Sequence, residues 1–365
     1  MTATADRLVG TETFAALTGN PVQISLWEQP GVVVHVELAR SADLAIVAPA
    51  TANVIAKLAN GLADDLLTAT LLEARCPLVI APAMHTGMWE HPATRSNVAA
   101  LKERGVRLVG PVSGALAAGD EGIGRMAEPE DIAAAARAAV GPKDLAGVRV
   151  VVTEGPTHEP IDTVRFIGNR SSGRMGVAIA VEAASRGADV HLVLGPGTVR
   201  PPLGLSIEKV STAEEMRAAV LAAFEDADAV VMAAAVADFR PKVFAEDKLK
   251  KEAGIPELHL EPTPDILREL GERKGNRVLI GFAAETRDLQ DSGRRKLREK
   301  DLDLVVVNRV GREGTGFGAD TNEAMLLTED GPDEPLRMWT KTELAAAICD
   351  RIVVSGAARR SRSRP

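Results

Sequence analysis

Short apolar runs alternate with longer Ala-rich segments along most of the chain. Apolar runs of this kind, bounded by glycine, proline or polar residues, are typical of strands buried on both faces of a parallel sheet. We expect such strands at residues 44–48, 78–81, 106–109, 148–153, 190–194, 229–233, 278–282 and 304–307. The Ala-rich segments between them, such as 130–139, 176–186 and 213–224, are predicted helices. This alternation predicts βαβ units and a doubly wound α/β architecture.

One segment interrupts the alternation and divides the chain. Residues 141–147 contain glycine and proline, and a strongly apolar strand follows them directly. We therefore expect two doubly wound domains, at residues 1–140 and 148–354, with 141–147 as the linker. The final stretch, 355–365, is rich in arginine and is predicted to be a disordered basic tail.

Composition restricts the classes of function. The chain has 365 residues, enough for two domains, and its net charge of −8 argues against generic nucleic-acid binding. No apolar run approaches the length of a membrane span. The two cysteines, Cys76 and Cys349, lack metal-ligand spacing and fit a reducing compartment. We expect a cytoplasmic protein with small-molecule partners that binds neither nucleic acid nor membrane.

The richest polar chemistry follows the predicted strand at 148–153. Residues 153–162 begin at the carboxyl end of that strand, where α/β sheets bind ligands. Residues 169–176, NRSSGRMG, stand directly before a predicted helix. Such a loop either offers backbone N–H groups to an anion or forms only a serine cap and a glycine turn. It is not the G-x-G-x-x-G motif of dinucleotide-binding proteins.

Further candidate groups follow the later strands. Small residues at 232–237 let a flat base approach the backbone, and Asp238 can accept hydrogen bonds from a ligand. The lysine-rich segment 248–251 either closes over phosphates or is a solvated charge run. Residues 263–267, TPDIL, suit phosphate binding or simple helix capping.

A pair of lysines completes this set. Lys296 and Lys300 are one helical turn apart, so both ammonium groups can reach one site or can share an exposed helix face. Residues 281–286, GFAAET, end another predicted strand.

From about Val148 to Ile352, these segments resemble the phosphopantothenate–cysteine ligase half of the bifunctional coenzyme A biosynthesis family. The resemblance implies a Rossmann-like ligase domain in which CTP activates the carboxylate of 4′-phosphopantothenate as an acyl-cytidylate, which cysteine then attacks. CTP rests on the bacterial relatives, because animal relatives use ATP. Mg²⁺ is implied by the triphosphate, with its ligands in the protein unassigned. The family's ligase domain is a dimer with shared active sites.

The resemblance also assigns roles to residues. Lys248 is the expected catalytic cation on the phosphates, and Asn169 orients the acyl-cytidylate for attack by cysteine. The remaining nucleotide contacts that the resemblance implies are Met232, Ala233, Ala234, Asp238, Pro264, Asp265, Ile266, Leu267, Phe282, Lys296 and Lys300.

The first half of the chain holds three weaker features. His35 stands in a helix-like stretch, Thr51 and Asn53 follow one predicted strand, and residues 81–89, APAMHTGMW, follow another. Each also has a plain structural explanation: a satisfied polar residue, a helix cap, or packing.

Together these features resemble the FMN-dependent phosphopantothenoylcysteine decarboxylase half of the same family, a flavodoxin-like flavoprotein domain. The resemblance implies that His35 is the catalytic histidine in a site shared between subunits, and that these domains assemble as trimers or multiples of trimers. The FMN and substrate loops would comprise Thr51, Asn53, Pro82, Ala83, Met84 and His85.

This half departs from the family pattern in three ways. The opening strand and its glycine-rich turn are not found before residue 44, His85 replaces the usual asparagine, and Ala118 stands where many members carry a proton-donating cysteine. We favour a start site further upstream over a degenerate domain. Either way, we expect a complete ligase half and weak FMN binding by an incomplete flavoprotein half.

Two rival interpretations remain. An NAD(P)-dependent oxidoreductase would use the same scaffold, but the dinucleotide motif is missing. A non-catalytic regulatory protein on a decayed flavoprotein domain is disfavoured by the full set of ligase residues.

Overall fold

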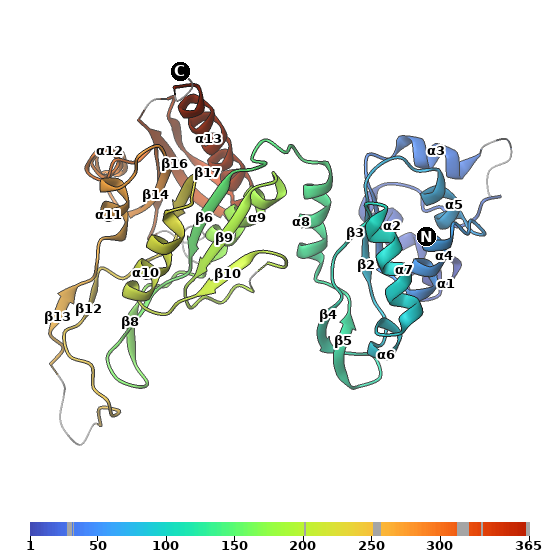
Figure 1. The fold of residues 1–365 in the computed structure, drawn as a ribbon, viewed down its shortest axis with the longest axis horizontal. Coiled ribbons are helices and arrows are strands. Elements are labelled where there is room, and N and C mark those ends of the chain that lie inside the picture. Colours follow the sequence, from blue (N-terminus) through green and yellow to red (C-terminus); the bar gives the residue numbers. More distant parts are fainter. Residues whose placement is uncertain are drawn as a thin grey trace. The chain divides into compact units, whose positions relative to one another are not determined.

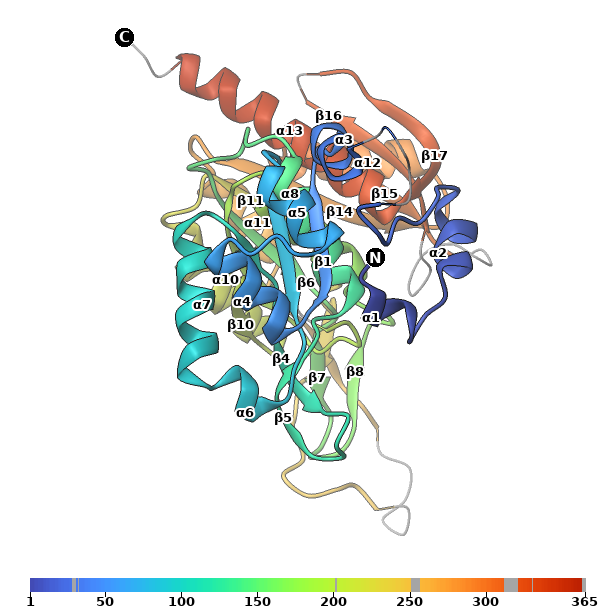
Figure 2. The ribbon, with the colours of Figure 1, turned by 90° about the vertical axis from the view of Figure 1, so that its right-hand side faces the viewer.

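The structure, a computed structural model, describes residues 1–27, 31, 33–200, 202–250, 257–311, 321–329 and 331–362, with side chains as far as residue 356. The chain forms two compact units, Met1–Gly141 and Pro142–Pro365 (Figures 1 and 2). Among the described residues, no helix combines the length and apolar character needed to cross a bilayer.

The second unit is built on an open, mostly parallel sheet. In the described residues its order is β10-β9-β6-β11-β14-β15-β16-β17. The strands are β6 (Arg149–Glu154), β9 (Asp189–Leu194), β10 (Ser206–Lys209), β11 (Ala229–Met232), β14 (Val278–Glu285), β15 (Leu304–Arg309), β16 (Thr321–Thr328) and β17 (Glu334–Thr340). The strand order reverses between β6 and β11, as in doubly wound nucleotide-binding folds.

Helices cover both faces of this sheet and create two apolar cores. One core contains Val150 and Val152 and is covered by helices α9 (Arg174–Ser185) and α13 (Lys341–Arg362). The other core contains Val151 and is covered by helices α10 (Ala213–Phe224), α11 (Ile266–Glu272) and α12 (Leu289–Glu299). Because successive strand residues point to opposite faces, both must be apolar when both faces are covered, which explains the unbroken valine runs.

The predicted α/β class is confirmed, and every predicted strand corresponds to an observed one. The structure also adds to these expectations and corrects one of them. The strand at 304–307 is not parallel on both sides, because β15 pairs antiparallel with β16. Strands β16, β17 and the edge strand β10 were missed, because half-exposed strands lack a continuous apolar run. In residues 355–362, the first part of the predicted disordered tail, the backbone continues helix α13.

Part of the segment expected to be a linker packs on the second unit. Leu145 is completely buried in the core beneath α9. The buried guanidinium of Arg186, at the end of α9, forms ion pairs with Asp144 (2.9 Å) and with Asp350 on α13 (2.6 Å). These contacts tie residues 144–145 and two helices into one layer.

The first unit contains a smaller parallel sheet, ordered β1 (Ala45–Ala50), β2 (Leu78–Pro82) and β3 (Arg107–Leu108) in its described residues. Around it lie α1 (Ala3–Asp6), α2 (Thr11–Thr18), α3 (Val34–Ser41), α4 (Ala52–Asn60), α5 (Leu66–Glu73), α6 (Thr86–Trp89), α7 (Pro92–Glu103) and α8 (Pro129–Val140). A hairpin of β4 (Val112–Ala115) and β5 (Glu121–Arg125) follows the sheet. Ile46 on the edge strand β1 is 46% exposed.

Candidate functional site

A cavity of about 780 Å³ opens at the carboxyl ends of the strands in the second unit. It lies where the strand order reverses, beside the loops that follow β6 and β11. Doubly wound sheets bind their ligands at this position, because the loops on either side of the reversal diverge and leave a crevice. The expected residues that line it are Asn169, Met232, Ala233, Ala234, Asp238, Pro264, Asp265, Ile266, Leu267, Phe282, Lys296 and Lys300.

Two buried threonines fix the wall formed by residues 233–237. The hydroxyl of Thr153 accepts a hydrogen bond from the Ala234 amide (3.1 Å), and that of Thr157 accepts one from the Ala237 amide (2.9 Å). Both threonines are fully buried, so the loop after β11 is held at two points. Its alanines keep side chains short, and a planar ligand can therefore approach the backbone.

Asn169 joins the two loops that flank the cavity. Its side-chain amide donates to the carbonyl oxygens of Ala235 (3.0 Å) and Val236 (3.1 Å). The loop before α9 and the loop after β11 are thereby held together. Any ligand between them meets a defined wall.

The opposite wall carries two lysines from α12. The Lys300 ammonium lies 2.8 Å from Asp265, which also caps α11 by accepting the Arg268 amide. Burial opposes ionisation of Asp265, but the Lys300 and Arg268 hydrogen bonds outweigh it and hold the pKa of this carboxyl below its usual value. Lys296 donates to the Phe282 carbonyl. Burial lowers the pKa of Lys296, and the neighbouring Lys300 charge lowers it further.

The structure does not place Lys248 among the residues that line this cavity. Its side chain is exposed, on a loop between β12 (Phe239–Pro241) and β13 (Leu260–Pro262). Lys250 belongs to the same loop, whereas Lys251 lies outside the described residues.

Sequence reasoning missed a second group of lining residues: Asn308, Asn322 and Lys341. Lys341 donates to the Asn322 side chain at 2.6 Å. They come from β15, β16 and the start of α13, so only the three-dimensional fold brings them to the cavity. A single asparagine within a strand gives no recognisable signal in the sequence.

Glu154 was also missed. Its side chain is completely buried at the end of β6, and neither carboxyl oxygen has a hydrogen-bond partner among the described residues. Burial raises the pKa of Glu154 to about 8. The carboxyl lies against Gly173 and Gly176 at the start of α9, where an added Cβ would come within 1.6 Å and 2.3 Å of Glu154 atoms. Both glycines are therefore required for this close approach.

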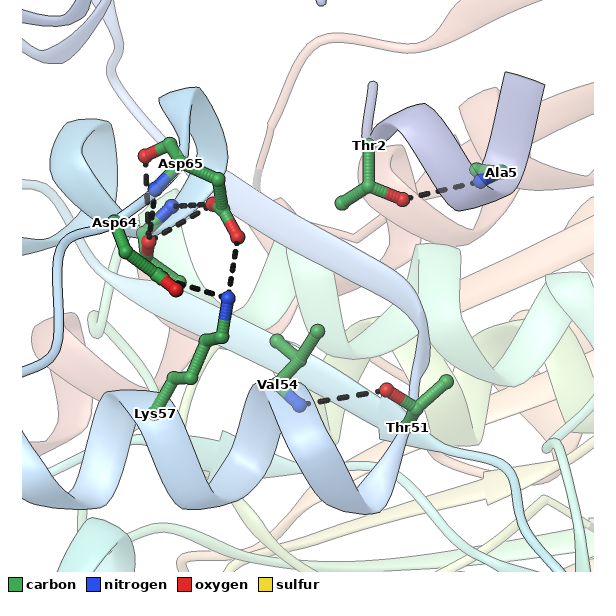
Figure 3. Close-up of polar contacts among 8 residues, drawn as sticks. Thr2, Ala5, Thr51, Val54, Lys57, Asp64 and Asp65 are labelled. Carbon is green, nitrogen blue, oxygen red and sulfur yellow. Dashed lines mark hydrogen bonds and ion pairs between the residues drawn. The ribbon is translucent and has the colours of Figure 1, made fainter. Parts of the chain in front are cut away.

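In the first unit, the two loops expected to bind FMN lie side by side. Strands β1 and β2 are parallel neighbours, and the Ala83 amide donates to the Ala50 carbonyl at 3.1 Å. Thr51 and Asn53 therefore lie beside residues 82–85 at one edge of the sheet. Thr51 caps α4 by accepting the Val54 amide (Figure 3).

A compact ion-pair cluster supports this helix from its other end. The Lys57 ammonium, only 17% exposed, contacts Asp64 (2.6 Å) and Asp65 (2.9 Å), and Asp65 caps α5 (Figure 3). The hydrogen bonds that its ammonium donates to the carboxylates of Asp64 and Asp65 raise the pKa of Lys57. The cluster ties the last turn of α4 to the start of α5.

The β4–β5 hairpin covers residues 84–86. The Met84 amide donates to the Gly124 carbonyl (3.0 Å), and His85 Nε2 lies 2.9 Å from Asp120 in the hairpin turn. Ala118 belongs to the same turn, which connects β4 and β5. His85, which stands where the family pattern has asparagine, is thus paired with a carboxylate next to the position of the missing thiol.

His35 lies elsewhere. It stands in the first turn of α3, and in both ribbon views α3 is at the opposite end of the first unit from α6, which begins directly after His85 (Figures 1 and 2). The structure does not bring His35 to the other residues expected for the flavin site within one chain.

Two family models match the chain. One, described as the DNA/pantothenate metabolism flavoprotein C-terminal domain, matches residues 145–355. The other, described as flavoprotein, matches residues 1–141.

Several known proteins are similar over nearly the whole chain. The coenzyme A biosynthesis bifunctional protein CoaBC of Mycobacterium tuberculosis is 48% identical over 370 residues, which cover 96% of this chain and 88% of that protein. Its Bacillus subtilis counterpart is 46% identical, with the same coverage. A cysteine/cysteine sulfinic acid decarboxylase from an unknown prokaryotic organism is 44% identical and covers 93% of this chain and 98% of its own.

One solved structure supports the fold of the second unit. The crystal structure of the C-terminal domain of a coenzyme A biosynthesis bifunctional protein CoaBC has a TM-score of 0.50 and 39% identity, and covers 58% of this chain and 97% of that domain.

Glu154 generates a testable pH dependence. Its folded-state pKa, about 8, exceeds the ordinary value of 4.5, so the folded state holds a proton that the unfolded state releases between these values. The free energy of unfolding should therefore fall with rising pH across this window, by up to about 1.4 kcal/mol per pH unit, and Glu154→Gln should remove that component. Urea denaturation of both proteins at several pH values measures it. Glu299→Gln, at an exposed site on α12, should keep the wild-type slope, and equal slopes for wild type and Glu154→Gln would contradict the assignment.

Proposed function

The chain belongs to the family of bifunctional coenzyme A biosynthesis proteins, and we propose that its second unit joins 4′-phosphopantothenate to cysteine with CTP. Membership is shown by the C-terminal family model, which matches over half of the chain, and by relatives up to 48% identical across 96% of it. The activities of this family in coenzyme A biosynthesis are ligation and decarboxylation, one for each unit.

The observation that carries the ligase proposal is the cavity at the strand-order reversal. A substrate carboxylate oxygen attacks the α-phosphorus of CTP, forming an acyl-cytidylate and releasing pyrophosphate. The cysteine nitrogen then attacks the acyl carbon, so that CMP leaves and the nitrogen loses a proton. The fixed backbone of residues 233–235 suits the base, while Lys296 and Lys300 supply positive charge for phosphates.

We place Lys248 on the phosphates and Asn169 at the acyl-cytidylate. Asn169 already joins the two loops that flank the cavity. Lys248 is carried by an exposed loop that does not line this cavity, so we propose that it reaches the nucleotide in the cavity of a second subunit. Mg²⁺ would enter with the triphosphate; the described residues contain no group of three or more His, Cys, Asp or Glu side chains arranged to hold a metal by themselves.

For the first unit we propose FMN-dependent decarboxylation of 4′-phosphopantothenoylcysteine. The side-by-side loops at Thr51–Asn53 and 82–85 fit a flavin, since they offer backbone and polar groups at the carboxyl edge of parallel strands. FMN bound there supplies the two-electron oxidation of the cysteine side chain that assists loss of CO₂, and returns the electrons afterwards. His35 would act from a neighbouring subunit, which is consistent with its distance from these loops.

We propose that the protein is a cytoplasmic homo-oligomer. We propose dimer contacts through the second unit and trimer-based contacts through the first, with phosphopantothenate, cysteine and CTP as the small-molecule partners.

Replacing the proposed phosphate cation should stop the first half-reaction. In Lys248→Gln the charge that faces the phosphates is lost, and we expect acyl-cytidylate formation to fall by at least about 100-fold. Mass spectrometry of mixtures with CTP and phosphopantothenate, without cysteine, measures the intermediate. Lys250→Gln, on the same loop, should retain near-normal formation. Full formation by Lys248→Gln would refute the assignment.

Replacing Asn169 should instead block the second half-reaction. Asn169→Ala loses both hydrogen bonds to the loop after β11, so we expect acyl-cytidylate to form and then accumulate even when cysteine is present. Time courses of CMP release and intermediate mass measure this. Ser171→Ala is the matched loop control. If Asn169→Ala shows no accumulation with cysteine, the proposed role is wrong.

FMN occupancy tests the first unit. Strand β1 forms an edge of the described sheet, with apolar Ile46 exposed, so the flavin loops receive little support on that side. We expect the purified chain to contain well under one FMN per chain, with Asn53→Ala lowering it further. Visible absorbance and FMN released on denaturation give the ratio. Stoichiometric FMN would overturn this expectation, and assays with phosphopantothenoylcysteine and with free cysteine would then identify the substrate.

A further inference from the structure

Asp162 is a buried carboxylate whose hydrogen bonds connect two separate loops. It lies in the turn between β7 (His158–Pro160) and β8 (Phe166–Gly168), and its side chain is completely shielded from solvent. Its Oδ1 atom accepts the amides of Val164 (2.9 Å) and Arg165 (2.7 Å). These two bonds close the turn in which Asp162 itself stands.

Its second oxygen acts outside that turn. Asp162 Oδ2 accepts the backbone amide of Leu249 (3.1 Å) and the Nε of Arg165 (2.9 Å). The Arg165 guanidinium in turn donates to the carbonyl oxygen of Leu249. Both backbone polar groups of Leu249 are therefore bound by an Asp162–Arg165 pair that belongs to a different part of the chain.

A backbone contact extends this attachment. The Ala245 amide donates to the Ile161 carbonyl (3.1 Å), and Ala245 and Asp162 form an isolated β-bridge. The loop that carries Lys248 is thus fixed on both sides of this lysine, at Ala245 and at Leu249. Strand β12, from which the loop departs, also contacts β7 and β8.

The hydrogen bonds around Asp162 stabilise the ionised form of its side chain. Burial opposes ionisation, but the amides of Val164, Arg165 and Leu249 and the Arg165 guanidinium outweigh it and hold the pKa far below its usual range. The carboxylate remains an acceptor throughout the working range of pH. Hydrogen bonds to an ionised acceptor are shorter and stronger than those between neutral groups.

We propose that Asp162 is a positioning residue for Lys248: through the Leu249 backbone it fixes the base from which the lysine side chain reaches the nucleotide phosphates. This inference rests on the proposed ligase function, in which Lys248 is the phosphate cation. The two oxygens divide the roles, since Oδ1 stabilises the local turn and Oδ2 holds the lysine loop. A long, exposed lysine gains effective concentration at its target when its backbone is fixed, because fewer conformations compete.

The test compares Asp162→Asn with Glu159→Gln. Asparagine keeps one acceptor oxygen but places an N–H₂ group against either the Leu249 amide or the turn amides. Glu159 is a matched control, because it is equally buried on the neighbouring strand β7 and accepts the Ala213 amide (2.8 Å), at the start of α10 and away from the lysine loop. A misplacement of about 1 Å costs on the order of 100-fold in rate, so Asp162→Asn should slow acyl-cytidylate formation by about that factor.

The kinetic pattern separates positioning from general damage. In Asp162→Asn the rate of the first half-reaction should fall while the KM for cysteine stays at the wild-type value, and Glu159→Gln should keep both. A folded Asp162→Asn that forms acyl-cytidylate at the wild-type rate overturns the proposal. Absence of acyl-cytidylate with the wild-type chain would instead overturn the ligase function, so the two failures are distinguishable.

Hydrogen exchange of the wild-type chain tests the attachment without any substitution. The Leu249 amide should exchange slowly, because it is bound to a shielded carboxylate, and Lys248 should resist trypsin in the native chain. In Asp162→Asn both protections should be lost, and in Glu159→Gln they should remain. A Leu249 amide that exchanges at the rate of an open loop in the wild-type chain overturns the proposal.

Discussion

The hydrogen bonds from the Ala234 and Ala237 amides to the buried hydroxyls of Thr153 and Thr157 determine the shape of the main cavity. Strands β6 and β11 are parallel neighbours at the reversal of strand order, so the loops that follow them would diverge without a cross-link. The threonine hydroxyls provide that link at the floor, and Asn169 provides a second one closer to the rim. The remaining groups of the site, including the lysines of α12, face a wall that is already fixed.

Much of the fold follows from local patterns. Valine-rich runs such as 150–152 are explained by burial on both faces, and the alternation with Ala-rich helices leads to the correct architecture. The half-exposed strands β10, β16 and β17 do not have such a pattern, because their stability comes from neighbours that are distant in sequence. Helix α13 continues beyond residue 355, an extent that the arginine-rich composition of this segment does not predict.

The site was only partly accessible to sequence reasoning. Residues 232–238 could be identified because they follow a strand at the carboxyl edge of a parallel sheet, a known ligand position, and residues 264–267 because proline and aspartate mark a helix start. Asn308 and Lys341 could not, since each is an isolated polar residue until β15 takes its place in the sheet and α13 packs against it. Glu154 could not be identified from the sequence for another reason. Its carboxyl is buried without a hydrogen-bond partner in the described residues because it packs against Gly173 and Gly176, and sequence spacing does not reveal such a contact.

Glu154 and Asp162 are two shielded carboxyl groups of one unit whose proton affinities move in opposite directions on folding. Glu154 meets no donor in the described part of the chain and becomes a weaker acid, whereas Asp162 meets several N–H groups and becomes a stronger one. Folding therefore takes up a proton at the end of β6 and, in acid, releases one at the β7–β8 turn. High pH therefore destabilises the packing of Glu154 beneath α9, because it ionises this carboxyl. Low pH destabilises the attachment of the lysine loop, because it protonates Asp162. The native state of this unit is thus stable only between these two limits of pH.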